Sequence, residues 1–543
     1  MKRELKTLLA RAPLLDVFGL LAIFSIGYVY TSEIFQYLDV GLYDESTYLQ
    51  SGLMIPRSIP TAENAPLYAF WYRFLSFFEQ DNLMLYYFNY KAMTILPAMA
   101  LFGALRVHGV SRVMSIALSL WILFSSANFS NWPKVTHFAL TVMLLGILGV
   151  GLVEKLTTKV AVLFIACLVA SYARPEYFLS AILFGALYIV LLGRQFKSEG
   201  LKSCLPVSVA LVVISYSALL WLGSPIASGN RSMIAFSQHY ALNWVDWHND
   251  GRIPWTHSDA IVKGDFGDVQ SVGEALAANP GAFGRHVLSN MLHAPRELVS
   301  TFLSKYWLTE WARVGVAFGI LFVVMAMTLH LWGRREVAAT GIRGRLRRGW
   351  FGLAVVFILL LPSIISVLLV YPREHYLLAS GTIAAFAAIV ALAKGSGELD
   401  WRGREAMIIM VGLALLIVRP LSIPPGGAAQ PNLKTIQYLR SLGINDKVNI
   451  LEAEGGYGIY IGEHFRRVAE YDKKTPWSAF LAEKKISLIV VSEVLARDPR
   501  FAGDPEWVSF VNAPEAAGFA SSNIPGVEGR RLIYRDGLLP PKP

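Results

Sequence analysis

The sequence predicts an all-α polytopic membrane bundle of about eleven transmembrane helices, followed by a small C-terminal α/β domain outside the cytoplasm. Of the 543 residues, 54% are hydrophobic and 16% are charged, whereas a soluble chain carries about a quarter charged residues. The mean hydropathy is +0.46. Long apolar runs recur until a Pro/Gly-rich stretch at 423–427, after which the composition becomes that of a soluble domain.

A helix that crosses the hydrocarbon needs roughly 20 predominantly apolar residues. The ranges expected to span are 14–30, 84–105, 113–130, 137–153, 158–173, 177–193, 205–222, 313–333, 350–371, 376–393 and 406–422. We expect the first of them to be retained in the mature protein, because no small-residue cleavage site follows it.

Basic residues gather in the connections on one side of these expected helices. Arg106 and Arg112 lie between the second and third helices, and Lys155 and Lys159 lie between the fourth and fifth. This pattern follows the positive-inside rule, so the N-terminus is expected in the cytoplasm and the C-terminal domain outside it. The net charge of +10 is then a consequence of topology, and no nucleic-acid partner is expected.

Two regions follow from this topology. Residues 1–425 are expected to form the membrane domain, with long outward loops at 31–83 and 223–312, and residues 426–543 the soluble extracytoplasmic α/β domain. The aromatic residues of the outward loops suit interfacial helices or an aromatic belt at the membrane surface.

The C-terminal region has its own pattern of helix and strand signals. Residues 434–442 have the spacing of an amphipathic helix, and 448–451 and 486–491 have the length and composition of buried strands. This domain carries no recognisable catalytic motif, so it is expected to pack over the outward loops.

An acidic pair, Asp44 and Glu45, follows the first expected helix. Carboxylates next to a membrane-embedded bundle are costly, which favours a role in chemistry or binding. Adjacent side chains diverge, so one carboxylate can face a reacting hydroxyl while the other is hydrogen-bonded to structure or to a second ligand. The alternative is a helix start whose acidic residues complement the helix dipole.

Basic side chains that could bind a phosphate interrupt the later apolar runs. Arg174 and Glu176 flank a proline between two expected helices, and Arg373 and His375 lie in another such turn. Guanidinium groups bind phosphate in bidentate fashion and neutralise its charge as it departs. Lys91, near the outward end of the second helix, could join them or extend to the interface, and Arg174 with Glu176 could be an interfacial ion pair.

This arrangement of outward polar clusters on a helix bundle resembles the GT-C glycosyltransferases, especially the bacterial lipid-A aminoarabinose transferases and the protein O-mannosyltransferases. Those proteins carry a paired acidic motif after their first helix, which Asp44-Glu45 matches in position and type. The resemblance implies an integral protein of the bacterial inner (cytoplasmic) membrane. It also implies inverting transfer of a sugar from a polyprenyl-phosphate donor to a glycan, lipid or protein acceptor at the extracytoplasmic face.

The same resemblance assigns expected roles to individual residues. Asp44 is expected to be the base and Glu45 to position the acceptor, although these two roles could be exchanged. Lys91, Arg174, Arg373 and His375 are expected to bind the donor phosphate. The residues expected to contact the acceptor or substrate are Tyr43, Tyr48, Glu176 and Glu374.

No cofactor is expected. Some members of this superfamily use a divalent cation held by acidic residues, but the sequence has no second acidic cluster, and its two cysteines, Cys167 and Cys204, indicate no thiolate metal site. Two other functions stay open. A polymerase or ligase of lipid-linked oligosaccharides would use the same kind of site, with the 223–312 loop at its centre. A transporter would show internal repeats and helices broken at the membrane midplane, and the sequence has neither.

Overall fold

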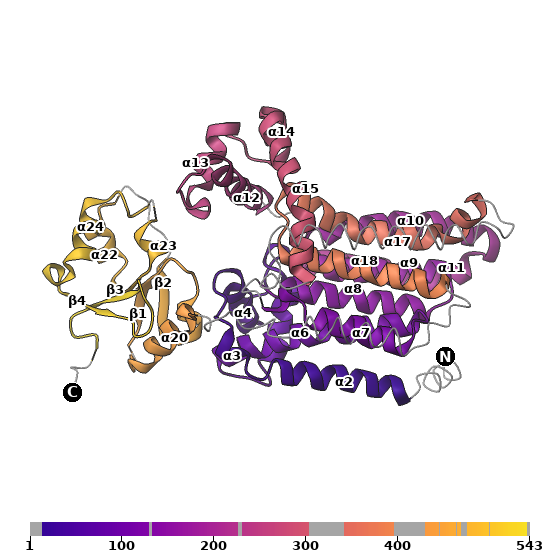
Figure 1. Ribbon diagram of the computed structural model, residues 1–543, viewed down its shortest axis with the longest axis horizontal. Coiled ribbons are helices and arrows are strands. Elements are labelled where there is room, and N and C mark those ends of the chain that lie inside the picture. Colours follow the sequence, from indigo (N-terminus) through magenta and orange to yellow (C-terminus); the bar gives the residue numbers. More distant parts are fainter. Residues whose placement is uncertain are drawn as a thin grey trace.

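The computed structural model describes residues 14–129, 133–225, 231–302, 342–395, 429–444, 446–462, 464–468, 475–498 and 500–539. It is mostly helical (71%), with a small C-terminal sheet region, and Figure 1 shows the long helices side by side with the sheet beyond one end of them. The expected spans 313–333 and 406–422 and the expected linker at 423–427 lie outside the described residues.

The long helices of the bundle fall on ranges that the sequence predicts to be apolar spans. They are α2 (Leu14–Tyr30), α6 (Asn82–Val107), α7 (Arg112–Leu123), α8 (Val135–Leu152), α9 (Leu156–Ser171), α10 (Tyr177–Glu199), α11 (Leu201–Leu222), α17 (Ile342–Leu369) and α18 (Glu374–Gly395). Helix α7 is shorter than expected. The Asn128 amide donates to the carbonyl oxygens of Ile122 and Leu123, both at 2.8 Å, and so satisfies the last turn of α7.

Six helical segments within the described ranges are long and apolar enough to cross a membrane. These segments are Leu14–Tyr37, Val135–Leu152, Tyr177–Ser198, Leu205–Leu222, Trp350–Leu369 and Glu374–Ala391. On α11 the side chains of Val212 and Leu220 are 67% and 66% exposed, which suits a surface that faces lipid. The chain is therefore a membrane protein built on apolar helices.

Close contacts at glycine positions hold α8 against its two neighbouring helices. Helix α8 packs against both α6 and α9. A Cβ atom added at Gly146 of α8 would collide with Ala166 of α9, and one added at Gly151 would collide with Val107 of α6. In a lipid environment such close backbone approach is a main source of helix association.

Shorter helices cover one end of the bundle, which we call the α4 end (Figure 1). They are α3 (Ile34–Tyr37), α4 (Asp44–Met54), the 3-10 turn η1 (Ala62–Asn64) and α5 (Pro66–Leu75). A second 3-10 turn, η2 (Ser126–Phe129), follows α7. In the 31–83 loop, the aromatic-rich stretch 63–80 suits an interfacial helix and contains the shorter α5, which begins with a proline at its first turn.

The loop expected at 223–312 contains a separate group of helices. They are α12 (Arg231–His248), α13 (Pro254–Phe266), α14 (Val272–Ala278) and α15 (Pro280–Phe302). The rings of Phe236, Phe266 and Phe283 form the centre of a hydrophobic core within this group. Part of the aromatic content of this loop therefore packs inside a folded unit.

The C-terminal region is built on a five-stranded sheet with the order β2-β1-β3-β5-β4. Its strands are β1 (Val448–Leu451), β2 (Phe465–Val468), β3 (Ile486–Val491), β4 (Phe519–Asn523) and β5 (Arg531–Arg535). The first three strands are parallel, and β5 pairs antiparallel with β3 and β4. The helices here are α20 (Pro431–Ser441), α21 (Tyr457–Ile461), α22 (Trp477–Glu483), α23 (Glu493–Ala496), α24 (Pro505–Asn512) and the 3-10 turn η3 (Pro514–Ala517).

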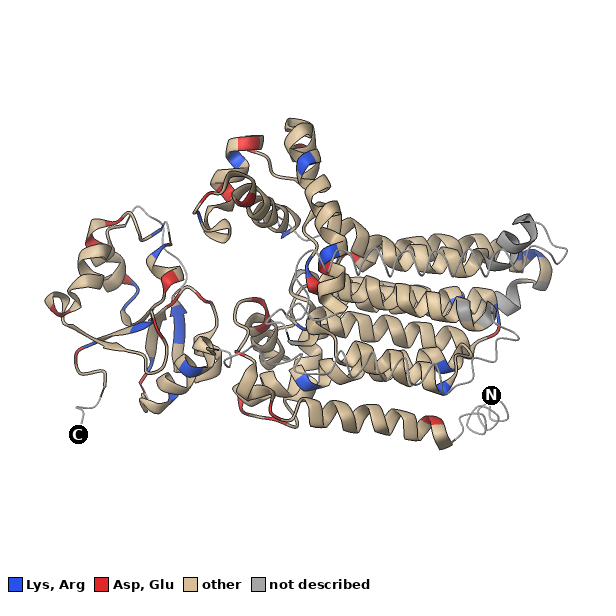
Figure 2. Cartoon of the chain, in the orientation of Figure 1, with Lys and Arg blue, Asp and Glu red and all other residues tan. Residues whose placement is uncertain are grey.

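Charged residues lie mainly at the ends of the bundle helices and in the C-terminal region, as Figure 2 shows. At the end opposite to α4, the guanidinium groups of Arg106 and Arg112 bind the carboxylate of Asp16 at 2.9 and 2.7 Å. The length of the bundle between its two ends is formed mostly by uncharged residues.

Candidate functional site

The first turn of α4 presents the acidic pair. Tyr43 precedes the helix with φ of 58°, a left-handed conformation that turns the chain sharply into α4. Consecutive residues on a helix do not face the same direction. Asp44 is accordingly exposed, whereas Glu45 is buried, with 2% of its surface accessible. The expected divergence of the pair is thus present.

Glu45 is surrounded by donors from three other elements. Its Oε1 accepts hydrogen bonds from Tyr68 Oη at 2.7 Å, from Asn89 Nδ2 at 3.1 Å and from Tyr72 Oη, and its Oε2 accepts the Lys134 peptide N–H at 2.9 Å. Burial raises the pKa of this carboxyl, against the effect of these hydrogen bonds. The acceptor-positioning role expected for Glu45 does not fit this geometry, because protein groups already occupy both oxygens.

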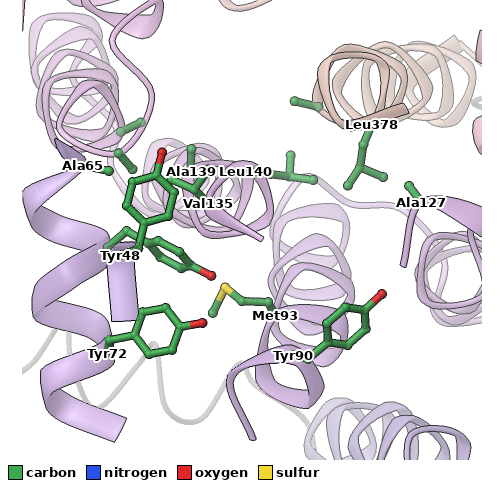
Figure 3. Packing of buried hydrophobic residues seen from close by; sticks show 14 of the residues in the cluster. Tyr48, Ala65, Tyr72, Tyr90, Met93, Ala127, Val135, Ala139, Leu140 and Leu378 are labelled. Atoms are coloured by element: carbon green, nitrogen blue, oxygen red, sulfur yellow. The ribbon is translucent and has the colours of Figure 1, made fainter. Parts of the chain in front are cut away.

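Buried tyrosines form much of this environment. Figure 3 shows Tyr48, Tyr72 and Tyr90, which come from α4, α5 and α6, grouped around Met93 in the buried cluster. The Tyr48 ring also packs edge-on against the ring of Tyr68, with 5.5 Å between centroids. The first turn of α4, which carries the acidic pair, therefore packs against buried aromatic side chains.

Lys134 is a site residue that the sequence analysis missed. Its Nζ donates to the carbonyl oxygens of Ala127 and Asn128 at 3.1 and 3.2 Å and lies 4.0 Å from the centroid of the Tyr90 ring. Burial lowers the pKa of this lysine to about 7, although the Glu45 carboxylate acts in the opposite direction. The available signal is its position directly before a long apolar run, in a polar break that the sequence predicts to lie on the outward side.

A second missed residue, Arg231 at the start of α12, faces α4. Its Nη2 donates to Tyr48 Oη at 2.9 Å. Arg231 also lies within electrostatic range of both Asp44 and Arg174. The 223–312 loop thus contributes an arginine beside the exposed carboxylate, and Tyr48, expected to contact substrate, is buried and anchors that arginine.

Arg174 and Glu176 form an ion pair, with 2.7 Å between Nη2 and Oε1. The guanidinium of Arg174 also lies 4.8 Å from the centroid of the Tyr376 ring. Burial lowers the pKa of Arg174, but the Glu176 carboxylate raises it, and the pKa is higher than usual as a result. The interfacial-pair alternative therefore describes the contact between these two side chains, and Tyr376 links them to the first turn of α18.

The turn that begins α18 brings three expected residues to the same place. The guanidinium of Arg373 lies 4.8 Å from the centroid of the Trp255 ring of α13, and burial lowers its pKa to about 10. His375 lies within electrostatic range of both Arg373 and Arg174. Glu374 is 8% exposed and acts electrostatically on Lys134. We call Arg174, Arg231 and Arg373 the arginine cluster.

Lys91 does not join the arginine cluster through any described contact. Its Nζ donates to the carbonyl oxygen of Ser32, just beyond the end of α2, at 3.3 Å. The neighbouring Tyr90 faces Lys134, and successive residues on a helix point in different directions. The phosphate-binding role expected for Lys91 is therefore not supported by its position, and Lys134 is the lysine beside the acidic pair.

A cavity of about 300 Å³ lies apart from this region, inside the α12–α15 group. Its lining residues are Tyr240, Trp247, His248, Asp265, Asn279, Gly281, Ala282 and Arg285. Along α12, Trp247 is roughly 24 Å from Arg231 at 1.5 Å per residue. This cavity is consequently distinct from the surroundings of Asp44.

The chemistry available around α4 is that of one exposed carboxylate, Asp44, within electrostatic range of Arg231, which is itself within range of Arg174. Within the described ranges, no group of three or more His, Cys, Asp or Glu side chains is arranged to hold a metal ion. Tyr43 is exposed and directly precedes Asp44 in the chain. Its expected contact with substrate stays a prediction. No protein-family model and no curated protein matches this chain.

Proposed function

We propose that this protein is an integral membrane glycosyltransferase of the GT-C type, which transfers a sugar from a polyprenyl-phosphate donor to an acceptor outside the cytoplasm. The observation that carries the proposal is the exposed Asp44 at the start of α4, with Arg231 within electrostatic range of it and of Arg174. A base next to phosphate-binding cations is what displacement of a phosphate from a sugar requires.

In the proposed reaction, an acceptor hydroxyl or amine attacks the anomeric carbon of the donor while Asp44 takes its proton. The bond between that carbon and the phosphate oxygen breaks, and the phosphate leaves with the electron pair. Attack opposite to the leaving group inverts the configuration. The arginine cluster neutralises the negative charge that develops on the phosphate, which is worth more in a site partly shielded from water.

A lipid-linked donor must reach the site sideways from the bilayer, so the site belongs at a membrane surface. Arginines of the α4 end come from turns between apolar helices: Arg174 precedes α10 and Arg373 precedes α18. We place this end on the extracytoplasmic face, in a topology of about eleven spans with a cytoplasmic N-terminus. Arg106 and Arg112, at the opposite end of the bundle, support this orientation.

The proposal is tested with Asp44→Asn in purified full-length protein reconstituted in lipid nanodiscs. A panel of synthetic polyprenyl-phosphate sugars serves as donor, membrane glycolipid extract serves as acceptor, and released polyprenyl phosphate is measured. We expect wild-type turnover with at least one donor and a loss of 100-fold or more in Asp44→Asn, in line with the roughly 10²–10⁴-fold contribution of a general base.

Asp259→Asn is the matched control, because Asp259 is an exposed aspartate on the neighbouring α13. It should keep wild-type turnover. Equal turnover in Asp44→Asn and Asp259→Asn would remove Asp44 as the base. Absence of release from every donor by the wild-type protein would contradict the proposed function itself.

A further inference from the structure

The C-terminal domain is hydrogen-bonded directly to the start of α4. The carbonyl oxygen of Gly455 accepts the Tyr43 peptide N–H at 2.8 Å and lies 2.9 Å from Ser46 Oγ, whose one hydrogen is shared with the Tyr43 carbonyl oxygen at 2.7 Å. These two donors stand on either side of Asp44 and Glu45 in the chain. One carbonyl of the C-terminal domain thus fixes the first turn of α4 from both sides.

The loop that supplies this carbonyl is itself held rigidly. The carboxylate of Glu452, at the end of β1, accepts the Gly456 N–H at 2.8 Å and also the Gly455 N–H. Glu452 is 2% exposed, and Arg467 of β2 binds it at 3.3 Å. A carboxylate that accepts two backbone N–H groups and faces a guanidinium makes strong, charge-assisted contacts. The sheet therefore determines where the Gly455 carbonyl points.

A second set of contacts holds the segment that leads into α4. The buried carboxylate of Asp39 accepts the peptide N–H groups of Asn432 and Leu433 at 3.1 and 2.8 Å, at the N-terminus of α20. In return, Asn432 Nδ2 donates to the carbonyl oxygen of Val40 at 3.0 Å. An aspartate from the membrane domain thus caps a helix of the C-terminal domain.

Gly456 lies against α4 so closely that no side chain fits there. A Cβ atom at this position would lie 2.7 Å from Ser46 Cβ and would overlap Ser46 Oγ. Gly456 also has φ of 147°, which residues with a side chain rarely adopt. Any residue with a side chain at this position would therefore have both a strained backbone and a steric clash with α4.

From these contacts we propose that the C-terminal domain is a positioning element for Asp44, and that the Gly455–Gly456 loop sets the geometry of the first turn of α4. For its catalytic consequence the inference rests on the proposed function. Loosening this contact lets Asp44 move relative to the arginine cluster. A misplacement of about 1 Å in a catalytic group can cost about 100-fold in rate, so the loss falls on kcat, while KM for the donor stays near the wild-type value.

The chain offers a matched pair of glycines for the test. Gly456 and Gly462 stand at the two ends of α21 and have almost the same φ, 147° and 149°. A Cβ at Gly462 meets no atom within 4 Å. Gly456→Ala and Gly462→Ala therefore share an unfavourable positive φ, although ψ differs (0° and 167°), and only the first places a Cβ against α4.

Hydrogen exchange of the full-length protein in nanodiscs is the primary measurement, because it does not depend on any activity. We expect backbone amides across residues 43–52 to exchange at least ten times faster in Gly456→Ala than in wild type, and Gly462→Ala to match wild type. If Gly456→Ala does not fold, Ser46→Ala replaces it, since it removes the hydroxyl contacts to Gly455 and to the Tyr43 carbonyl without backbone strain. If the backbone amides of residues 43–52 exchange at the wild-type rate in Gly456→Ala, or in Ser46→Ala where that variant replaces it, the proposal is overturned.

Kinetics then separate positioning from mere stability. With a donor accepted by the wild-type protein, Gly456→Ala should lower kcat at least tenfold with donor KM within twofold, whereas Gly462→Ala should change neither. Faster exchange of α4 with unchanged kcat would show docking without a positioning role. If no donor is turned over by wild type, the exchange result still decides the coupling between the domain and α4, and only the proposed function fails.

Discussion

The peptide N–H of Lys134 donates to Glu45 Oε2 at 2.9 Å, which joins the N-terminus of α8 to the first turn of α4. Through this bond a helix of the apolar bundle and a short helix at its surface share one buried carboxylate. Tyr68 and Asn89 bind the other oxygen of the same carboxylate. Glu45 therefore connects the elements on which the exposed Asp44 depends for its position.

Replacement of Glu45 should destabilise the protein, in contrast to replacement of its neighbour. Glu45→Ala removes the acceptor of the buried Tyr68 hydroxyl and of the Lys134 peptide N–H, and each buried donor left in this way costs about 1–3 kcal/mol. Glu45→Gln should be milder, because it keeps one acceptor but sets an NH2 group against the Lys134 N–H. Thermal unfolding in detergent should give the highest midpoint for wild type, a lower one for Glu45→Gln and the lowest for Glu45→Ala. Asp44→Asn should have the wild-type midpoint. Equal midpoints for all four proteins would mean that Glu45 is not a structural carboxylate.

The buried Lys134 should make stability depend on pH in a defined window. Its pKa falls from 10.5 to about 7 on folding, so between these values unfolding takes up a proton. The free energy of unfolding then rises with pH across this window, by up to about 1.4 kcal/mol per pH unit. Below pH 7 the lysine is protonated in both states and the dependence disappears.

The increase in the free energy of unfolding with pH can be assigned to Lys134 by comparison with a variant that lacks its amine. Lys134→Met should have a lower unfolding midpoint overall, because the carbonyl groups of Ala127 and Asn128 lose their donor. Between pH 7 and 10 the midpoint of wild type should increase relative to that of Lys134→Met. The surface variant Lys263→Met, whose lysine side chain is 66% exposed, should follow wild type. Parallel profiles for wild type and Lys134→Met would contradict the lowered pKa.

Arg373 should contribute to donor binding, and a similar arginine on α12–α13 should not. Arg373 stacks on Trp255 at 4.8 Å in the turn that begins α18. Arg252, between α12 and α13, stacks on Trp244 at 4.6 Å and pairs with Asp250 at 3.0 Å. A hydrogen bond to a charged group is worth about 1.5–3 kcal/mol, or roughly 10–100-fold in Kd.

Calorimetric titration with a polyprenyl-phosphate sugar measures this difference. Arg373→Ala should weaken binding by that factor, while Arg252→Ala should bind as wild type does. The same affinity in both variants would leave Arg373 as an anchor for the helices around it, and the arginine cluster would lose its proposed role.

The proposed topology predicts which surfaces are accessible from outside the cell. In a background with both cysteines replaced, Val508→Cys on α24 should react with a membrane-impermeant maleimide in intact cells. Val508 is 45% exposed. Lys197→Cys, at the far end of α10, should react only after permeabilisation. The reverse pattern would place the α4 end in the cytoplasm and exclude an extracytoplasmic acceptor.

Local pattern alone determined the bundle helices, the helix at 434–442 and two of the strands. Apolar runs of spanning length place the bundle helices, because hydrogen bonds within a helix satisfy its own backbone in lipid. Strands β1 and β3 have the bounds that their short apolar runs indicate, 448–451 and 486–491. The pattern does not predict strands β2, β4 and β5, since their residues are mixed in polarity and their pairing depends on partners distant in the chain.

The sequence also placed Asp44 and Glu45 together after the first helix, but only the tertiary structure decided which of them is buried. Neighbouring carboxylates on a helix have the same local signal, and the difference comes from Tyr68, Asn89 and Lys134, which reach Glu45 from other elements. Arg231 lies 183 residues from its partner Tyr48. No local period encodes such a contact, because it exists only once α12 folds back over α4.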